Sequence, residues 1–110
     1  MAEVREHELV IIGGGVAGLT ASIYAARYAL DLVLVAETGP GGQTAFATTI
    51  ENFPGFPEGI SGPELVMRLT QQAQNFGVPI ESARVQGIEP ADGRWRLLAA
   101  TAVGVAAVVL

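Results

Sequence analysis

The glycine-rich segment near the start of the chain has residue types and spacing that suit the binding of a dinucleotide. It reads Gly13-Gly14-Gly15-Val16-Ala17-Gly18 and so contains Gly-x-Gly-x-x-Gly. In such a segment Gly13 permits a tight turn, Gly15 lets the main chain approach a pyrophosphate, and Gly18 lets the following helix pack closely. The N–H groups and the dipole at the helix start then attract phosphates. The pattern therefore indicates a pyrophosphate site that needs no basic side chain.

An acidic residue about 20 positions after the glycines completes this pattern. Glu37 follows the apolar run Leu32-Val33-Leu34-Val35, and a carboxylate at that place accepts a hydrogen bond from an adenosine ribose. Its charge repels a 2′-phosphate, so the sequence favours FAD or NAD over NADP at this site. The other interpretation of the glycines is a sharp strand-to-helix turn that binds nothing, and the flanking segments argue against it.

The segments on either side of the glycines predict a strand, a helix and a second strand. Leu9 to Ile12 is a short apolar run, a helix is expected from about Ala17 to Tyr28, and residues 32–35 are typical of a buried parallel strand. Such a βαβ unit has a right-handed crossover. The predicted fold class is α/β, a Rossmann-like FAD/NAD(P)-binding fold with a parallel sheet.

The middle of the chain predicts a long loop followed by a helix. Residues 38–62 are rich in glycine and proline but keep several large apolar side chains, which favours an ordered loop that covers the ligand over a flexible linker. Ser61-Gly62-Pro63-Glu64 fits a capping box in which each of the two end residues binds the other's N–H group. The helix that follows is expected to end at Gly77.

The C-terminal third predicts a small β-hairpin or meander. A strand is expected from about Ile80 to Ile88, a turn at Pro90-Ala91-Asp92-Gly93, and a second strand from Arg94 to about Ala100. The last apolar run, from about Val103 to Leu110, is expected to return to the parallel sheet.

Composition excludes several classes of function. A length of 110 residues is enough for one domain or part of one. The chain carries a net charge of −5 and has no cysteine. The few, scattered arginines do not form a nucleic-acid-binding surface, and disulfide or thiolate metal sites are excluded within these residues. The single histidine, His7, stands in a polar leader and is expected to be solvated rather than a metal ligand.

Membrane insertion is not expected either. The first eight residues are mostly polar or charged, and the uncharged stretch 97–110 is shorter than the ~20 residues that a spanning helix needs. No secretory signal is apparent. The expected location is therefore the cytoplasm.

Three further segments carry a resemblance to a known family. They are Gly41-Gly42-Gln43, Glu51-Asn52-Phe53-Pro54-Gly55-Phe56 and Ser61-Gly62-Pro63-Glu64-Leu65. With residues 11–27, this order and spacing resembles the low-molecular-weight thioredoxin reductase family over nearly the whole chain. The resemblance implies that residues 1–110 are the N-terminal part of an FAD-binding domain. The NADPH-binding domain, with its Cys-x-x-Cys pair, and the C-terminal part of the FAD domain would then lie outside these residues.

The resemblance also implies which residues contact FAD. The backbone from Gly15 to Ala17 would meet the pyrophosphate, and Glu37 would hold the ribose of the adenosine. The other matching residues are Gly42 and Gln43 along the ribityl and pyrophosphate region, Thr48 near the flavin ring, Asn52 at the ribityl or isoalloxazine end, and Val85, whose backbone would touch the adenine. Two departures are Val16, where the family usually carries proline, and residues 44–47, which are less polar than in many members.

The function that the resemblance implies belongs to a longer parent protein. NADPH would reduce FAD, and the flavin would reduce a redox-active dithiol and then thioredoxin or a similar small disulfide protein, usually as a homodimer. The 110 residues would supply FAD binding, no catalytic residue and no turnover of their own. Two alternatives remain open: a ferredoxin or flavodoxin–NADP reductase of the same fold without the dithiol, and a non-catalytic FAD-binding module. A Cys-x-x-Cys pair beyond Leu110 would decide against the first alternative.

Overall fold

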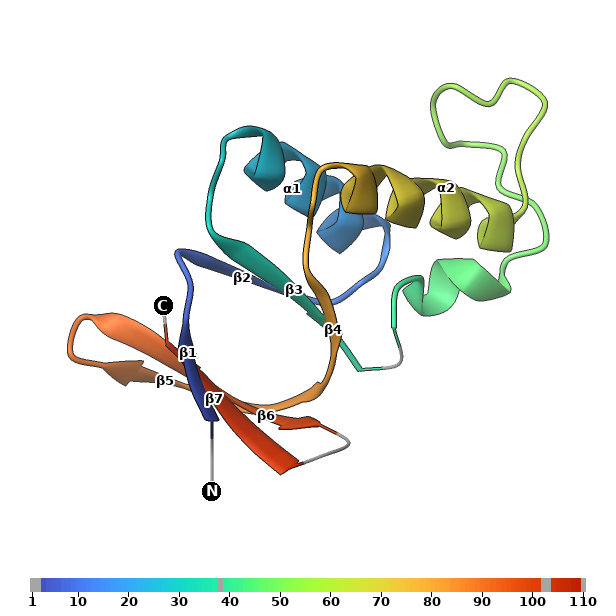
Figure 1. Cartoon of the computed structure of the whole chain (residues 1–110). Helices are drawn as coiled ribbons and strands as arrows, with labels where there is room; N and C mark the ends of the chain where they lie inside the picture. The colour runs from blue at the N-terminus through green and yellow to red at the C-terminus, as the bar shows by residue number, and fades with distance from the viewer. Residues whose placement is uncertain (1–2, 38, 102–103, 110) are drawn as a thin grey trace.

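The computed structural model describes residues 3–37, 39–101 and 104–109, and its helices and strands form three layers (Figure 1). The described elements in chain order are β1 (Glu3–Glu6), β2 (Leu9–Ile12), α1 (Val16–Arg27), β3 (Leu32–Ala36), the 3-10 helix η1 (Gly42–Phe46), α2 (Gly62–Asn75), β4 (Ile80–Ser82), β5 (Arg84–Ala91), β6 (Arg94–Thr101) and β7 (Gly104–Val109). The order β2, α1, β3 is the predicted βαβ unit.

The middle layer is a parallel sheet with the strand order β2-β3-β4. Every residue of its central strand, β3, is buried. Leu32, Leu34 and Ala36 face one hydrophobic cluster, together with residues of both helices. Val33 and Val35 face a second cluster that includes Ala99 of β6. Because both faces of β3 are covered, the strand is continuously apolar rather than alternating.

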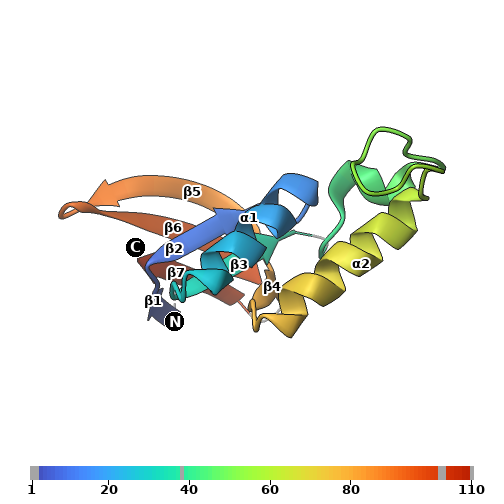
Figure 2. The same ribbon diagram turned by 90° about the horizontal axis from the view of Figure 1, so that it is seen from above.

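Helices α1 and α2 form the upper layer and lie side by side over the parallel sheet (Figures 1 and 2). The buried apolar residues are Leu19, Ile23 and Ala25 in α1, and Leu65, Val66, Leu69 and Ala73 in α2. In α2, residues 65, 69 and 73 recur every four positions, which places them on one face of the helix. The Ser61 hydroxyl caps α2 by accepting a hydrogen bond from the Glu64 N–H at 3.3 Å. The predicted hydrogen bond from the Ser61 N–H to the Glu64 carboxylate is not the one that the structure shows. That carboxylate accepts a hydrogen bond from Arg68 instead.

The lower layer is a mixed sheet with the order β1-β7-β6-β5. Strands β5 and β6 form the predicted hairpin, whose two turn residues, Asp92 and Gly93, both have positive φ, as a tight hairpin requires. The prediction that the last run returns to the parallel sheet is wrong. Strand β7 pairs with β6 and β1 in the lower sheet, while Val103 and Leu110 lie outside the described residues.

The single strand predicted from Ile80 to Ile88 is also wrong, since the chain leaves one sheet for the other at Ala83. Strand β4 pairs with β3, whereas β5 pairs with β6. Between them, the N–H of the buried Ala83 donates to the Ala36 carbonyl at 3.1 Å. This contact ties the junction of the two sheets to the end of β3.

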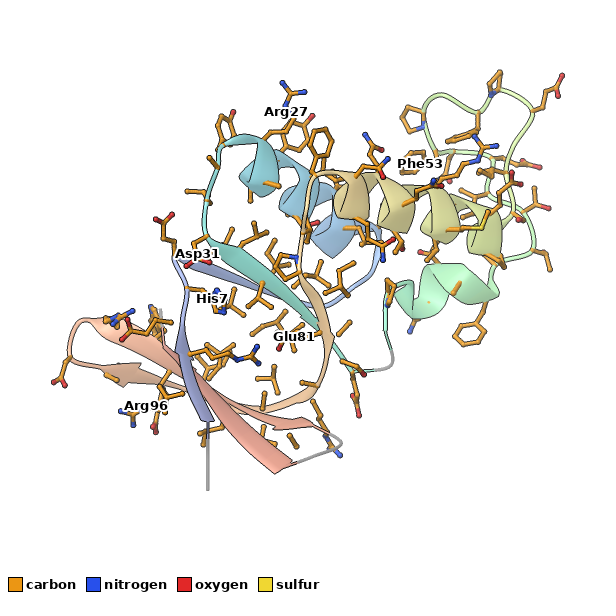
Figure 3. The ribbon with its side chains drawn as sticks, viewed as in Figure 1. His7, Arg27, Asp31, Phe53, Glu81 and Arg96 are labelled. Atoms are coloured by element: carbon orange, nitrogen blue, oxygen red, sulfur yellow. The ribbon has the colours of Figure 1, made fainter. Side chains whose placement is uncertain are left out.

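The polar leader is a strand, and its histidine is not solvated. Strand β1 pairs in parallel with β7. The His7 side chain is only 16% exposed, and its Nδ1 lies 3.0 Å from Asp31 Oδ1 (Figure 3). Arg5, on β1, forms a two-point ion pair with Glu81 on β4. The leader therefore connects the lower sheet to the parallel sheet, a role its local sequence pattern does not reveal.

Candidate functional site

The predicted dinucleotide residues gather at the carboxyl edge of the parallel sheet. Because β2, β3 and β4 run in parallel, the segments that follow them meet at one edge, which is where ligands bind in open α/β sheets. A cavity of about 330 Å³ lies there. The predicted site residues that line it are Gly13, Gly14, Glu37, Gly42 and Val85.

The glycine loop has the geometry expected for its glycines. Gly13 has a φ of +110°, which favours glycine, and its N–H donates to the Val35 carbonyl at 2.8 Å. A Cβ on Gly18 would stand 1.9 Å from the Gly13 carbonyl oxygen. A Cβ on Gly14 would stand 2.8 Å from the Ala36 Cβ. The loop, the helix start and the end of β3 are therefore packed too closely for side chains at these positions.

Gly15 differs from its neighbours because space lies open beside it. It is the N-cap of α1, and a Cβ built on it meets no atom of the chain within 4 Å. No side chain caps this helix end, and its first turn, which begins with Val16 and Ala17, holds no acidic residue. The N-terminus of α1 thus keeps its N–H groups and dipole available to an anion. By contrast, α2 is capped by Ser61.

A second segment lies directly against the glycine loop. The Gly41 N–H donates to the Gly14 carbonyl at 2.6 Å. Gly42 has a φ of +54°, and a Cβ on it would stand 3.6 Å from the Gly15 Cα. Gln43 follows on η1 and is exposed. Sequence patterns did not predict this short helix, because a five-residue 3-10 turn has no periodicity of its own.

Seven of the predicted residues do not line the cavity at the sheet edge: Gly15, Val16, Ala17, Gly18, Gln43, Thr48 and Asn52. Thr48 and Asn52 are both exposed, and neither lines that cavity. Asn52 instead lines a shallow hollow formed by its own loop, residues 51–57. This loop extends beyond the N-terminal end of α2 (Figure 1). The ligand contacts predicted for all twelve site residues, Thr48 and Asn52 included, stay predictions.

Glu37 stands at the cavity rim, beside a cation that the sequence patterns missed. Its carboxylate Oε1 lies 3.9 Å from the Nε of Arg84, and both residues line the cavity. The Ser82 hydroxyl donates to the Glu37 carbonyl at 3.1 Å. Arg84 was missed because the break at Ala83 was not predicted. Once β4 is paired with β3, the residues after β4 must come next to Glu37.

A larger hollow of about 630 Å³ lies across α1 and α2. Four of its nine lining residues are aromatic, namely Tyr24, Tyr28, Phe53 and Phe76. The Arg27 guanidinium lies 5.8 Å from the ring centre of Phe76. The hollow contains none of the glycines of the loop. Size alone therefore does not identify the dinucleotide site, since the smaller cavity is the one that Gly13, Gly14 and Gly42 line.

Two other kinds of site have no support in the part of the chain that the structure describes. No group of three or more histidine, aspartate or glutamate side chains is placed to hold a metal ion there. Among the same residues, every helix is too short or too polar to cross a membrane.

Comparison with known proteins agrees with this geometry. Residues 7–105 match the family model described as pyridine nucleotide-disulphide oxidoreductase. The thioredoxin reductase of Rickettsia prowazekii (strain Madrid E) is 45% identical over 82 residues, which are 74% of this chain and 26% of that protein. That of Vibrio cholerae serotype O1 is 38% identical over 97 residues, 88% of this chain and 30% of that protein.

A solved structure supports the same assignment. The thioredoxin reductase from Streptococcus pyogenes MGAS5005 superposes with a TM-score of 0.83 at 36% identity, over 94% of this chain and 33% of that one. The chain thus spans about a quarter to a third of the length of these relatives. With its glycine loop and parallel sheet, the chain belongs to the pyridine nucleotide-disulphide oxidoreductase family.

Proposed function

We propose that the chain is the FAD-binding portion of a thioredoxin reductase-like flavoprotein. The observation that carries the proposal is the cavity at the sheet edge, where Gly13 and Gly14, which lead into the uncapped start of α1, line the same space as Glu37. Its volume of about 330 Å³ is within the range of small-molecule pockets, roughly 300–1,000 Å³. Residues 1–110 remain proposed as the N-terminal part of that FAD domain.

The described residues fit the adenosine and pyrophosphate parts of FAD. The open space beside Gly15 admits a pyrophosphate close to the main chain, and the N–H groups of Val16 and Ala17 belong to the first turn of α1. Glu37 would accept hydrogen bonds from the ribose hydroxyls, and the backbone at Val85 would flank the adenine. Gly42 would extend the same surface, because it lies against Gly15.

The rest of the ligand would extend away from the cavity, past Gln43 toward Thr48 and Asn52. The three side chains are exposed. Amide side chains donate and accept hydrogen bonds at the same time, which suits the hydroxyl-rich ribityl chain. The resemblance to the thioredoxin reductase family supports these positions along the ribityl chain and the flavin ring.

In the parent protein, bound FAD would accept a hydride from NADPH and pass two electrons to a dithiol, which would reduce thioredoxin or a similar disulfide protein. These 110 residues contain no cysteine, so they supply binding and orientation only. The relatives at 38–45% identity are thioredoxin reductases, which supports this choice of partner. A homodimer and a cytoplasmic location complete the proposal.

The test uses the full product of the gene, freed of flavin. Titration with FAD is followed by quenching of flavin fluorescence, with ADP as the competitor and FMN, which has no adenosine, as the control. We expect FAD to bind, ADP to displace it, and FMN to bind far more weakly. Equal affinity for FMN and FAD, or no displacement by ADP, would contradict an adenosine site at this edge.

Activity tests the remainder of the proposal. The full product is expected to reduce thioredoxin with NADPH, and residues 1–110 alone are expected to show no turnover. A full product that binds FAD but reduces no disulfide would favour the reductase without a dithiol or the non-catalytic module. Turnover by residues 1–110 alone would refute the division of roles proposed here.

A further inference from the structure

Arg84 and Glu37 form a pair of opposite charges at one end of the cavity. The Arg84 Nε lies 3.9 Å from Glu37 Oε1, and both residues line the same 330 Å³ space as Gly13 and Gly14. Glu37 directly follows β3 of the parallel sheet, and Arg84 begins β5 of the lower sheet. Two segments that belong to different sheets therefore each contribute one charged side chain to the cavity lining.

Two hydrogen bonds to the carbonyl groups of residues 36 and 37 hold Glu37 and Arg84 next to each other. The Ala83 N–H donates to the Ala36 carbonyl at 3.1 Å, and the Ser82 hydroxyl donates to the Glu37 carbonyl at 3.1 Å. The chain then turns from β4 into the lower sheet (Figure 1). Because the preceding residues are fixed against the end of β3, Arg84 has to emerge beside Glu37.

Stability does not explain this pair. The side chains of Arg84 and Glu37 are 72% and 65% exposed, and exposed ion pairs contribute little to folding because water screens them. Exposure instead leaves both charged groups accessible to a ligand. A guanidinium is planar, stacks on aromatic rings and binds phosphate in two-point fashion, whereas a carboxylate accepts hydrogen bonds from ribose hydroxyls and repels phosphate.

We propose that Arg84 is a positioning and specificity residue of the adenosine pocket, which holds Glu37 toward the ribose and forms a wall for the purine ring. This inference rests on the proposed function. With Glu37 in place, the charge of Arg84 is neutralised, and the pocket selects a ribose with a free 2′-hydroxyl. Without Glu37, the same guanidinium becomes a binding site for a 2′-phosphate, to which it donates hydrogen bonds.

The test compares two small ligands, ADP and adenosine 2′,5′-bisphosphate, by calorimetry on the flavin-free full protein. Wild type is expected to prefer ADP. Arg84→Ala is expected to weaken ADP binding about tenfold. Arg84→Lys is expected to recover little of this affinity, because lysine keeps the positive charge but lacks the planar guanidinium group. Glu37→Gln is expected to shift the preference at least tenfold toward the bisphosphate. The double variant Glu37→Gln/Arg84→Ala is expected to lose that gain.

Two controls separate this role from a general loss of structure. Arg96→Ala removes another exposed arginine, paired with Glu89 on the hairpin and not part of the cavity lining, and is expected to leave both affinities unchanged. Thermal unfolding of each variant is expected to match wild type within a few degrees, since the altered side chains are exposed. A switch in ligand preference without a change in melting temperature is a result that a structural role does not produce.

The outcomes distinguish the inference from the proposed function. If Arg84→Ala binds ADP like wild type, and the double variant binds the bisphosphate as well as Glu37→Gln does, the role of Arg84 is overturned while FAD binding stands. If wild type binds neither FAD nor ADP, the proposed function and the inference both fail.

Discussion

Gly18 and Gly13 are in contact across the turn between β2 and α1, and a Cβ on Gly18 would stand 1.9 Å from the Gly13 carbonyl oxygen. Real side chains do not approach a carbonyl so closely. Because Gly18 has no side chain, the start of α1 can lie directly against the end of β2. This contact fixes the direction in which the N–H groups of the first helical turn point.

We predict that Gly18→Ala destabilises the protein and also impairs ligand binding. The added methyl group must push α1 away from Gly13, which typically costs about 1–3 kcal/mol for an overpacked site. Urea unfolding measures the loss of stability, and FAD titration measures the loss of affinity. Gly87→Ala is the matched control, because a Cβ at Gly87 meets nothing within 4 Å, and it is expected to change neither. A stable Gly18→Ala protein with normal FAD affinity would show that this close contact is not required.

The parts of the fold that could be predicted from sequence are those set by local pattern. β3 is a continuous apolar run, α2 begins at a serine cap and ends at Asn75, two residues before Gly77, and the hairpin turns at Asp92-Gly93. Each of these signals lies within the element itself or directly beside it. The glycine loop and Glu37 belong to the same class, because their spacing along the chain determines that they meet at the sheet edge.

The predictions that failed concern residues whose contacts lie far away in the sequence. β1 was not predicted because its pairing partner is β7, at the other end of the chain. His7 was expected in solvent, but its contact is Asp31, and Arg84 comes beside Glu37 only because the chain changes sheets at Ala83. Long-range pairing of this kind leaves no periodic trace in a single sequence.

The cap of α2 provides a prediction about local stability. Ser61→Ala removes the acceptor for the Glu64 N–H and is expected to lower the free energy of unfolding by about 1 kcal/mol. Ser61→Thr keeps a hydroxyl at the same place and is expected to recover most of the loss. Chemical denaturation of the two variants checks this. Equal stability of the alanine and threonine variants would show that the hydroxyl does not act as a cap.

The ion pair between the two sheets predicts a dependence of stability on pH. The hydrogen bonds from Arg5 hold the pKa of Glu81 below its ordinary value of 4.5, against the opposing effect of burial. A carboxyl with a lowered folded-state pKa stabilises the protein above its unfolded-state pKa, and this stabilisation is lost as the pH falls through the folded-state pKa. Wild type is therefore expected to lose stability below about pH 4.5 more steeply than Glu81→Gln.

Denaturant unfolding of both proteins between pH 3 and 7 measures this difference. The advantage of wild type over Glu81→Gln is expected to be full near neutral pH and to shrink toward acid. Glu89→Gln serves as the control, because it breaks a more exposed pair with Arg96 on the hairpin and is expected to cost less than about 1 kcal/mol. A gap between wild type and Glu81→Gln that stays constant over this pH range would contradict the role assigned to Glu81.

The central claim, that main-chain groups beside Gly15 bind the pyrophosphate, is tested most directly by FAD titration of Gly15→Ala in the full protein. A Cβ on Gly15 meets no atom of the chain, so unfolding is expected to change by at most about 1 kcal/mol, from the poorer N-cap preference of alanine. The methyl group would nevertheless occupy the space assigned to the pyrophosphate, so FAD affinity is expected to fall at least tenfold. Wild-type affinity in a normally folded Gly15→Ala protein would contradict the account.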